Sequence, residues 1–255
     1  YELADFLKKF PKNKYPNIPY LNPNNKNFLP QTRKKLIPKV EPFSDEKIIF
    51  DLKELLLKVN DENRDHVLDQ ILKLHFTPTS ETAIAQLIHE TVINCIFLVH
   101  VYVDVILGIE KKCPSIIQKI NECIMNQLHN PRQFSAENDE FACETAAQKA
   151  KKWRISNGIL ISELFLRNKY HHQFVINHIL VPLINRIGAQ DTVNIAVLNK
   201  IFPVIGAKLE LKHSANLDSI FYQLDKITKD NSLQPRLRFL IMDIIDLRKR
   251  GWDVK

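Results

Sequence analysis

Apolar residues recur at helical spacing along most of the chain. The first clear segment follows Ser44, and its apolar residues are Ile48, Leu52, Leu55, Leu56 and Val59. A spacing of three to four residues places such side chains on one face of a helix. No segment shows the regular alternation of apolar and polar residues that is typical of a strand. The pattern therefore predicts an all-α fold.

This helical pattern repeats, with short polar or proline-containing segments between the helices. Asp61 to Asn63 ends the first helix, and Thr77 to Ser80 ends the second and caps the third. Pro182 and Pro203 fall inside later helices and should kink them. We expect ten helices, the last eight at roughly 80–93, 96–109, 114–129, 143–167, 171–187, 190–209, 217–229 and 234–249.

One antiparallel helix pair cannot bury its own apolar stripes, so neighbouring pairs must stack. Five pairs between residues 44 and 255 give a period of about 40 residues, which is typical of a HEAT-repeat solenoid. A compact helical bundle of other connectivity is the structural alternative. The polar and acidic segment from Asn130 to Phe141 is expected to form a loop within the third pair.

Composition excludes several classes of protein. The most apolar stretch, Val92 to Leu107, is interrupted by Asn94, His100 and Asp104, so we expect no membrane span. Only five glycines occur in 255 residues, which disfavours phosphate-binding loops and all-β folds. The four cysteines form no C-x-x-C pair, and we expect reduced thiols in a cytoplasmic protein.

Residues that would carry catalysis or hold a metal are not arranged to do so. The pair His171 and His172 has no carboxylate or cysteine three or four positions further on. His89 and Glu90 begin like a zinc-protease motif, but the second histidine is missing. We therefore expect no enzyme, no metal and no cofactor, and solvated or capping roles for the paired histidines.

The N-terminal 43 residues differ from the rest of the chain. They hold nine basic and three acidic residues, which accounts for +6 of the formal net charge of +7, and seven of the thirteen prolines. Because proline fixes φ and removes an amide donor, residues 11–43 should form an extended linker arm.

A second basic cluster, Lys149 to Arg154, is interpreted as a solvated helix face in preference to an RNA contact, although it contains Trp153. Cations and aromatic rings interleave in the arm, where the candidate RNA contacts are Lys12, Lys14, Arg33, Lys34 and Lys35.

Three segments resemble the middle domain of eukaryotic initiation factor 4 gamma. Pro235 to Arg248, with Trp252 after it, resembles the last helix of that domain. Asn157 with Ser162 to Phe165 is similar to its G-N-I-x-F-I-G-E-L-F helix, although serines replace the glycines. Asn121 to Cys123 is similar to its L-L-N-R-C-Q stretch, with glutamate in place of arginine. The resemblance covers the body after the linker arm, and it implies five HEAT pairs.

The residues of the last helix are interpreted as maintaining the fold. We expect Arg236 or Arg238 to pair with Asp243 or Asp246 across one or two helical turns. The residues expected to surround this helix with apolar contacts are Phe239, Ile241, Ile244, Ile245 and Leu247.

Residues 1–10 resemble the Y-x-x-x-x-L-Φ peptide by which these scaffolds hold the cap-binding protein, initiation factor 4E. Phe6 stands where leucine is usual. An amphipathic helix with one apolar stripe suits binding in a partner's hydrophobic groove. The contacts implied by the resemblance are Tyr1, Leu3, Phe6, Leu7 and Phe10.

The resemblance implies a translation initiation scaffold with three parts: residues 1–10 for the cap-binding protein, 11–43 as linker, and 44–255 as the middle HEAT domain. That domain would bind and stimulate the DEAD-box RNA helicase, initiation factor 4A, and bring it to the 5′ end of mRNA, with weak mRNA contact. A HEAT adaptor in mRNA decay or splicing and a plain RNA-binding module are the alternatives. The helicase contacts implied by the resemblance are Lys119, Asn121, Glu122, Asn126 and Gln127.

Overall fold

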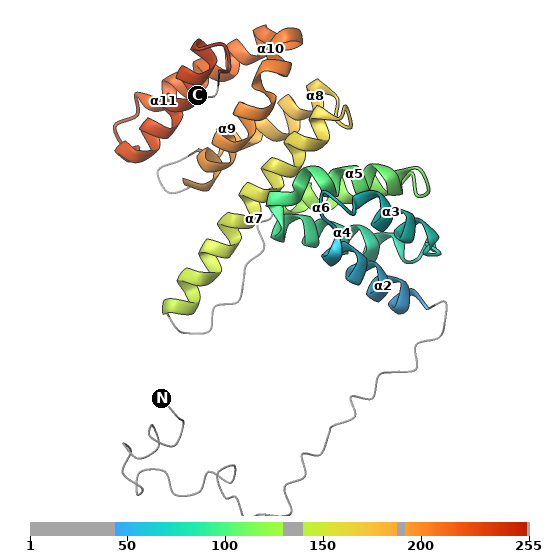
Figure 1. The fold of residues 1–255 in the computed structure, drawn as a ribbon. Coiled ribbons are helices and arrows are strands. Elements are labelled where there is room, and N and C mark those ends of the chain that lie inside the picture. Colours follow the sequence, from blue (N-terminus) through green and yellow to red (C-terminus); the bar gives the residue numbers. More distant parts are fainter. Residues whose placement is uncertain (1–43, 130–139, 188–191, 254–255) are drawn as a thin grey trace, which may run out of the picture. The chain divides into compact units, whose positions relative to one another are not determined.

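The computed structural model describes residues 44–129, 140–187 and 192–253, and all its regular elements in these ranges are helical (Figure 1). They belong to one compact unit, Glu41–Lys255. The all-α solenoid predicted from the sequence is confirmed. The elements are α2 (Asp45–Lys58), α3 (Arg64–Lys73), α4 (Glu81–Asn94), the 3₁₀ turn η2 (Ile96–Leu98), α5 (Val99–Glu110), α6 (Ile116–His129), α7 (Glu140–Leu166), α8 (His172–Val175), the π-helical turn η3 (Ile176–Leu180), α9 (Val181–Asn185), α10 (Thr192–Thr228) and α11 (Pro235–Lys249).

The helices begin and end where short polar segments offer hydrogen bonds to their free backbone groups. Ser44 Oγ accepts from the Lys47 amide at the start of α2, as the sequence predicts. Before α4, Thr77 and Ser80 exchange hydrogen bonds. The Ser80 amide donates to Thr77 Oγ1 and the Thr77 amide donates to Ser80 Oγ, at 3.2 and 3.1 Å. This reciprocal arrangement has the logic of a capping box.

The fourth and fifth pairs are separated by a kink where the sequence predicts a break between their helices. The helices expected at 190–209 and 217–229 both lie within α10, which leaves helical backbone angles between them, at His213 (φ −139°, ψ 39°), and not at Pro203. Pro182 lies in the first turn of α9, with Val181 between it and the π-helical turn. A proline has no amide hydrogen and its ring collides with the carbonyl four residues earlier, so the wider turn accommodates it.

Stacked pairs bury one continuous apolar core, and partly buried ion pairs connect the helices at its edge. Asp104 on α5 accepts hydrogen bonds from Arg64 on α3 and Arg167 after α7, at 2.8 and 3.0 Å. Arg167 also pairs with Glu163. This chain of charges connects three alternate helices, α3, α5 and α7. The sequence pattern did not indicate the pairs made by Asp104, because their partners lie 40 and 63 residues away.

The last helix keeps most of its expected apolar contacts but not its expected ion pairs. Ile241 and Ile244 are buried, whereas Phe239 is 63% exposed, so its predicted packing is wrong. Arg238 reaches back to the carbonyl of Asp230. Asp246 pairs with Lys249, so the pairing predicted for Asp246 is also wrong. The arginines precede these carboxylates by five to ten positions, which separates them by about 8–15 Å along the helix axis, so nearer partners are preferred.

In the described ranges, no single helix is long and apolar enough to cross a membrane. Together, α4 and the segment Ile96–Glu110 would meet the requirement by length and composition, although the two are bent by 102°.

Candidate protein interaction surface on α6 and α7

Helix α6 presents a polar outer face because its apolar residues occupy a single stripe. Ile116, Ile120 and Ile124 recur every four residues and are fully buried, which turns the opposite side of the helix outward. Glu122 and Asn126 are exposed there. Lys119, three residues before Glu122, lies on the same face.

The outer face of α6 is tied to α4 by hydrogen bonds at its start. Lys119 Nζ donates to Thr82 Oγ1 at 3.1 Å, and Gln118 donates to Glu122 at 3.3 Å. Ser115 donates to Glu81 at 2.6 Å. This bond is the main reason why the pKa of the Glu81 carboxyl is lowered. These contacts fix the position of the face without covering it.

Two of the five predicted helicase contacts do not share this outer face. Asn121 and Gln127 lie at the flanks of the buried stripe and are only partly exposed. Gln127 Oε1 accepts a hydrogen bond from Asn157 Nδ2 at 3.0 Å, and Asn121 Oδ1 is buried without a hydrogen-bond donor. The structure thus brings together Lys119, Glu122 and Asn126, and separates the other two from them.

A buried polar network connects α4, α6 and α7. His89 and Asn157 are 1% and 0% exposed, and His89 Nε2 lies 2.7 Å from Asn157 Oδ1. The Asn157 amide nitrogen donates to Gln127 Oε1 and to the carbonyl of Trp153, both at 3.0 Å. Its oxygen is therefore the acceptor for His89, which fixes the hydrogen on Nε2. His89 therefore has a structural role in this network. The sequence lacks the second histidine of a zinc-protease motif, and the structure gives His89 this role instead.

Burial lowers the pKa of His89, although the hydrogen bond to Asn157 and the charge of Glu90 partly oppose the shift. A histidine kept neutral in the folded protein binds fewer protons than the same residue in the unfolded chain. The free energy of unfolding therefore decreases as the pH falls through the unfolded-state pKa of about 6.5.

We expect the free energy of unfolding to decrease from pH 7.5 to pH 5.5, and part of this dependence to disappear in His89→Gln. The contribution of one group is at most about 1.4 kcal/mol per pH unit. Urea denaturation at several pH values, followed by circular dichroism, measures it. Equal slopes in the two proteins would show that His89 is not the responsible group.

The paired histidines differ: His171 has the expected capping role, whereas His172 is partly buried against an aromatic ring, so the role expected of it is wrong. His171 caps α8, because its Nδ1 accepts from the Gln173 amide. The ring of His172 packs edge-on against Phe165 with centroids 5.0 Å apart. In the described ranges, no group of three or more His, Cys, Asp or Glu side chains could hold a metal ion.

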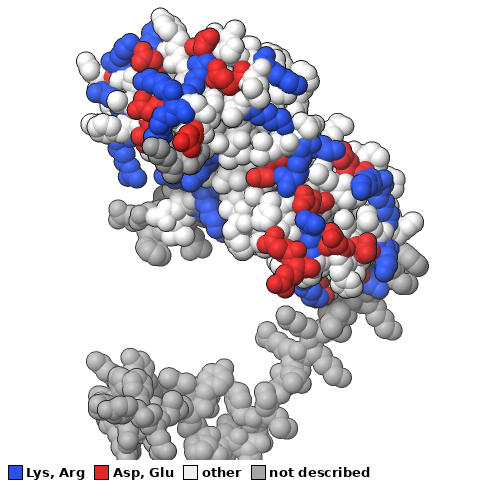
Figure 2. Space-filling view, turned by 45° about the horizontal axis from the view of Figure 1, so that its top comes forward, with Lys and Arg blue, Asp and Glu red and all other residues white. Residues whose placement is uncertain are grey.

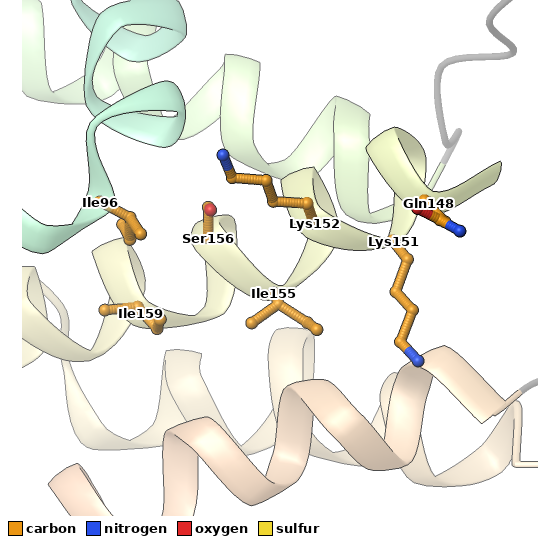
Figure 3. Close-up of a pocket in the computed structure, with 7 residues that line it drawn as sticks. All are labelled: Ile96, Gln148, Lys151, Lys152, Ile155, Ser156 and Ile159. Atoms are coloured by element: carbon orange, nitrogen blue, oxygen red, sulfur yellow. The ribbon is translucent and has the colours of Figure 1, made fainter. Parts of the chain in front are cut away.

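A shallow pocket of about 300 Å³ lies along the middle of α7 (Figure 3). Three isoleucines form its apolar part: Ile155 and Ile159 of α7, and Ile96 of η2. Lys151 and Lys152 line it further towards the start of the helix, and Figure 3 shows their side chains leaving α7 in different directions.

The basic cluster around this pocket does not offer an aromatic ring for stacking. Trp153 is only 8% exposed, and its Nε1 donates to Asn94 Oδ1 at 3.2 Å. Arg154 donates to Asn194 of α10. Lys151 and Lys152 are exposed, as the interpretation of a solvated helix face predicts. Bases stack on exposed rings, so the buried tryptophan argues against RNA at this position.

Charge on the described body is mixed. Outside residues 1–43 the chain holds 27 basic and 26 acidic residues. Figure 2 shows positive and negative side chains intermixed over the face drawn. A nucleic-acid site needs a field of one sign, so this face suits protein contacts better. The predicted cap-binding-protein contacts and the arm's RNA contacts lie outside the described residues.

The stacked helices and the exposed faces of α6 and α7 define a class of protein: a helical scaffold whose distinctive surfaces are exposed helix faces. Comparison then defines the family. The sequence model of the MIF4G domain matches residues 49–251, and the chain belongs to this family.

Known relatives agree with this assignment. Eukaryotic translation initiation factor 4 gamma 3 of Mus musculus is 30% identical over 123 residues, which covers 48% of this chain and 7% of that protein. Eukaryotic translation initiation factor 4 gamma 1 of Oryctolagus cuniculus is 28% identical over 110 residues, covering 43% and 8%. The matches therefore span a small part of these relatives.

A solved structure shows the same fold. The MIF4G domain of Trypanosoma cruzi translation initiation factor EIF4G5 superposes with a TM-score of 0.53 at 15% sequence identity, covering 81% of this chain and 97% of that one. This likeness shows the fold: the chain is a helical HEAT-type solenoid of the MIF4G family.

Proposed function

We propose that this chain is a translation initiation scaffold whose HEAT body binds the DEAD-box RNA helicase, factor 4A, and whose residues 1–10 bind the cap-binding protein, factor 4E. The observation that carries the proposal is the match to the MIF4G domain over 49–251. The outward face of α6 supports it, because Lys119, Glu122 and Asn126 form a positioned polar surface in a segment that resembles the family's.

The scaffold itself catalyses nothing in this proposal, and it acts through differential affinity. A helicase whose lobes are held by separate faces of the body would spend more time near its active arrangement. A scaffold can shift this equilibrium only by the difference between its affinities for the two arrangements. The N-terminal peptide and linker would add a high effective concentration of helicase near the mRNA 5′ end.

Replacing Glu122 by lysine together with Asn126 by arginine should weaken helicase binding at least tenfold, about 1.4 kcal/mol. Both residues are exposed, so their replacement should leave the fold intact, whereas bulky residues at Asn121 or Gln127 would disturb buried contacts. Isothermal titration of the full chain with factor 4A measures the effect.

The matched control is Asp69→Lys with His66→Arg, which makes the same change in net charge at exposed positions on α3. This control should bind like the unchanged chain. Equal affinity of the α6 variant and the control would refute the placement of the helicase on α6.

A further inference from the structure

The α7 residues that line the pocket form a stripe with the spacing of a helix-packing surface. Its α7 residues follow each other at i, i+3, i+4, i+7, i+8 and i+11, so they form a single face. Where two helices pack, side chains in such rows interdigitate with those of the partner. The α7 residues of the stripe are Gln148, Lys151, Lys152, Ile155, Ser156 and Ile159.

One end of the stripe is apolar and open. Ile96, Ile155 and Ile159 are each only partly buried, although they line a common hollow of about 300 Å³. Phe97, next to Ile96 on η2, is 75% exposed. Partly exposed apolar residues that line a hollow, with an exposed aromatic ring adjoining it, are typical of a site that another molecule covers.

The other end of the stripe is positively charged. Lys151 and Lys152 line it, and no carboxylate is among the pocket's lining residues. Both lysines are exposed. They precede Ile155 by one helical turn, as Figure 3 shows. The occupant that complements this surface carries carboxylates beside its apolar residues.

We propose that this groove binds an acidic amphipathic helix of a partner protein. Apolar side chains of that helix lie on Ile96, Ile155 and Ile159, and its Asp or Glu residues, one or two turns away, pair with Lys151 and Lys152. A peptide is favoured over RNA because Trp153, the ring within the basic cluster, is buried, while the exposed ring of Phe97 adjoins Ile96 at the apolar end. The proposal concerns a surface separate from the outer face of α6 and does not rest on helicase binding.

The test uses the full chain and a fluorescein-labelled 18-residue helical peptide with leucine at i, i+3, i+4 and i+7 spacing and glutamate beside the leucines. Fluorescence anisotropy should show saturable binding. Lys151→Glu with Lys152→Glu should weaken it at least tenfold, and so should Ile155→Glu. Lys151→Arg with Lys152→Arg should retain it, because the charge is kept.

The matched control is Lys53→Glu with Lys73→Glu, an equal change in charge at exposed positions on α2 and α3, which should bind the peptide unchanged. The lysine pair is exposed, so its variant remains informative even where Ile155→Glu fails to fold.

The proposal is overturned by any of four results: no binding, equal binding by the Lys151/Lys152 variant, equal binding of a peptide with lysine in place of glutamate, or concentration-dependent dimerisation that depends on these lysines. Binding of a U-rich RNA oligonucleotide in place of the peptide, lost in the same variant, would assign the groove to RNA instead.

Discussion

Asn157→Leu should lower the free energy of unfolding by about 3–5 kcal/mol. Asn157 is completely buried, and its amide connects His89, Gln127 and the carbonyl of Trp153. Leucine has similar volume but no polar atoms, so it would leave His89 Nε2 and Gln127 Oε1 without partners. Each buried group left in this way costs about 1–3 kcal/mol. Urea denaturation followed by circular dichroism at 222 nm measures the change.

Asn185→Leu provides the matched control, because Asn185 is exposed at the end of α9. Its free energy of unfolding should stay within about 0.5 kcal/mol of the unchanged chain. A loss at Asn157 no greater than at Asn185 would show that the network does not stabilise the fold.

Gly206→Ala should also destabilise the chain, by about 2 kcal/mol, although alanine is the better helix former. A Cβ at Gly206 would lie 2.1 Å from the Trp252 ring. Trp252 follows α11 after Gly251, and both residues have positive φ, 69° at Gly251 and 68° at Trp252. This left-handed turn directs the indole onto Phe202 and Phe221, with ring centroids 6.0 and 5.8 Å away.

A double-mutant cycle distinguishes this contact from a general helix effect. Trp252→Ala alone should cost about 3 kcal/mol. In that background Gly206→Ala meets no ring, so it should be neutral or stabilising by up to about 1 kcal/mol. Additive effects of the two substitutions would contradict the packing described for the C-terminal turn.

Local pattern was sufficient to predict the helices, since each amphipathic stripe spans only a few turns. Apolar spacing predicted α2 through its buried residues Ile48, Leu52 and Leu56. It also placed the break within α10 correctly, because residues 210–216 lack the apolar spacing of a helix and the backbone kinks at His213, whereas the kink expected at Pro203 is not where the backbone angles depart from helical values. The ion pairs of Asp104 and the contact between Gly206 and Trp252 depend on which helices become neighbours.

The candidate site was predicted in part, for the same reason. Outward positions on α6 follow from its apolar stripe, and this places Glu122 and Asn126 correctly on one face. The assignment of Gln127 to that face was wrong, because Gln127 lies beside the buried apolar stripe and accepts a hydrogen bond from Asn157. The sequence contains a signal for the pocket on α7, because Ile155 and Ile159 follow the basic cluster at helical spacing. The contribution of Ile96 could not be predicted, because it depends on how η2 packs beside α7.

The central claim is that one chain holds two initiation partners at once. Size-exclusion chromatography with light scattering of the full chain, mixed with factors 4A and 4E, tests it most directly. A single 1:1:1 complex should elute. Tyr1→Ala with Leu7→Ala should release factor 4E alone, and Glu122→Lys with Asn126→Arg should release factor 4A alone. Separate elution of all three proteins would contradict the claim.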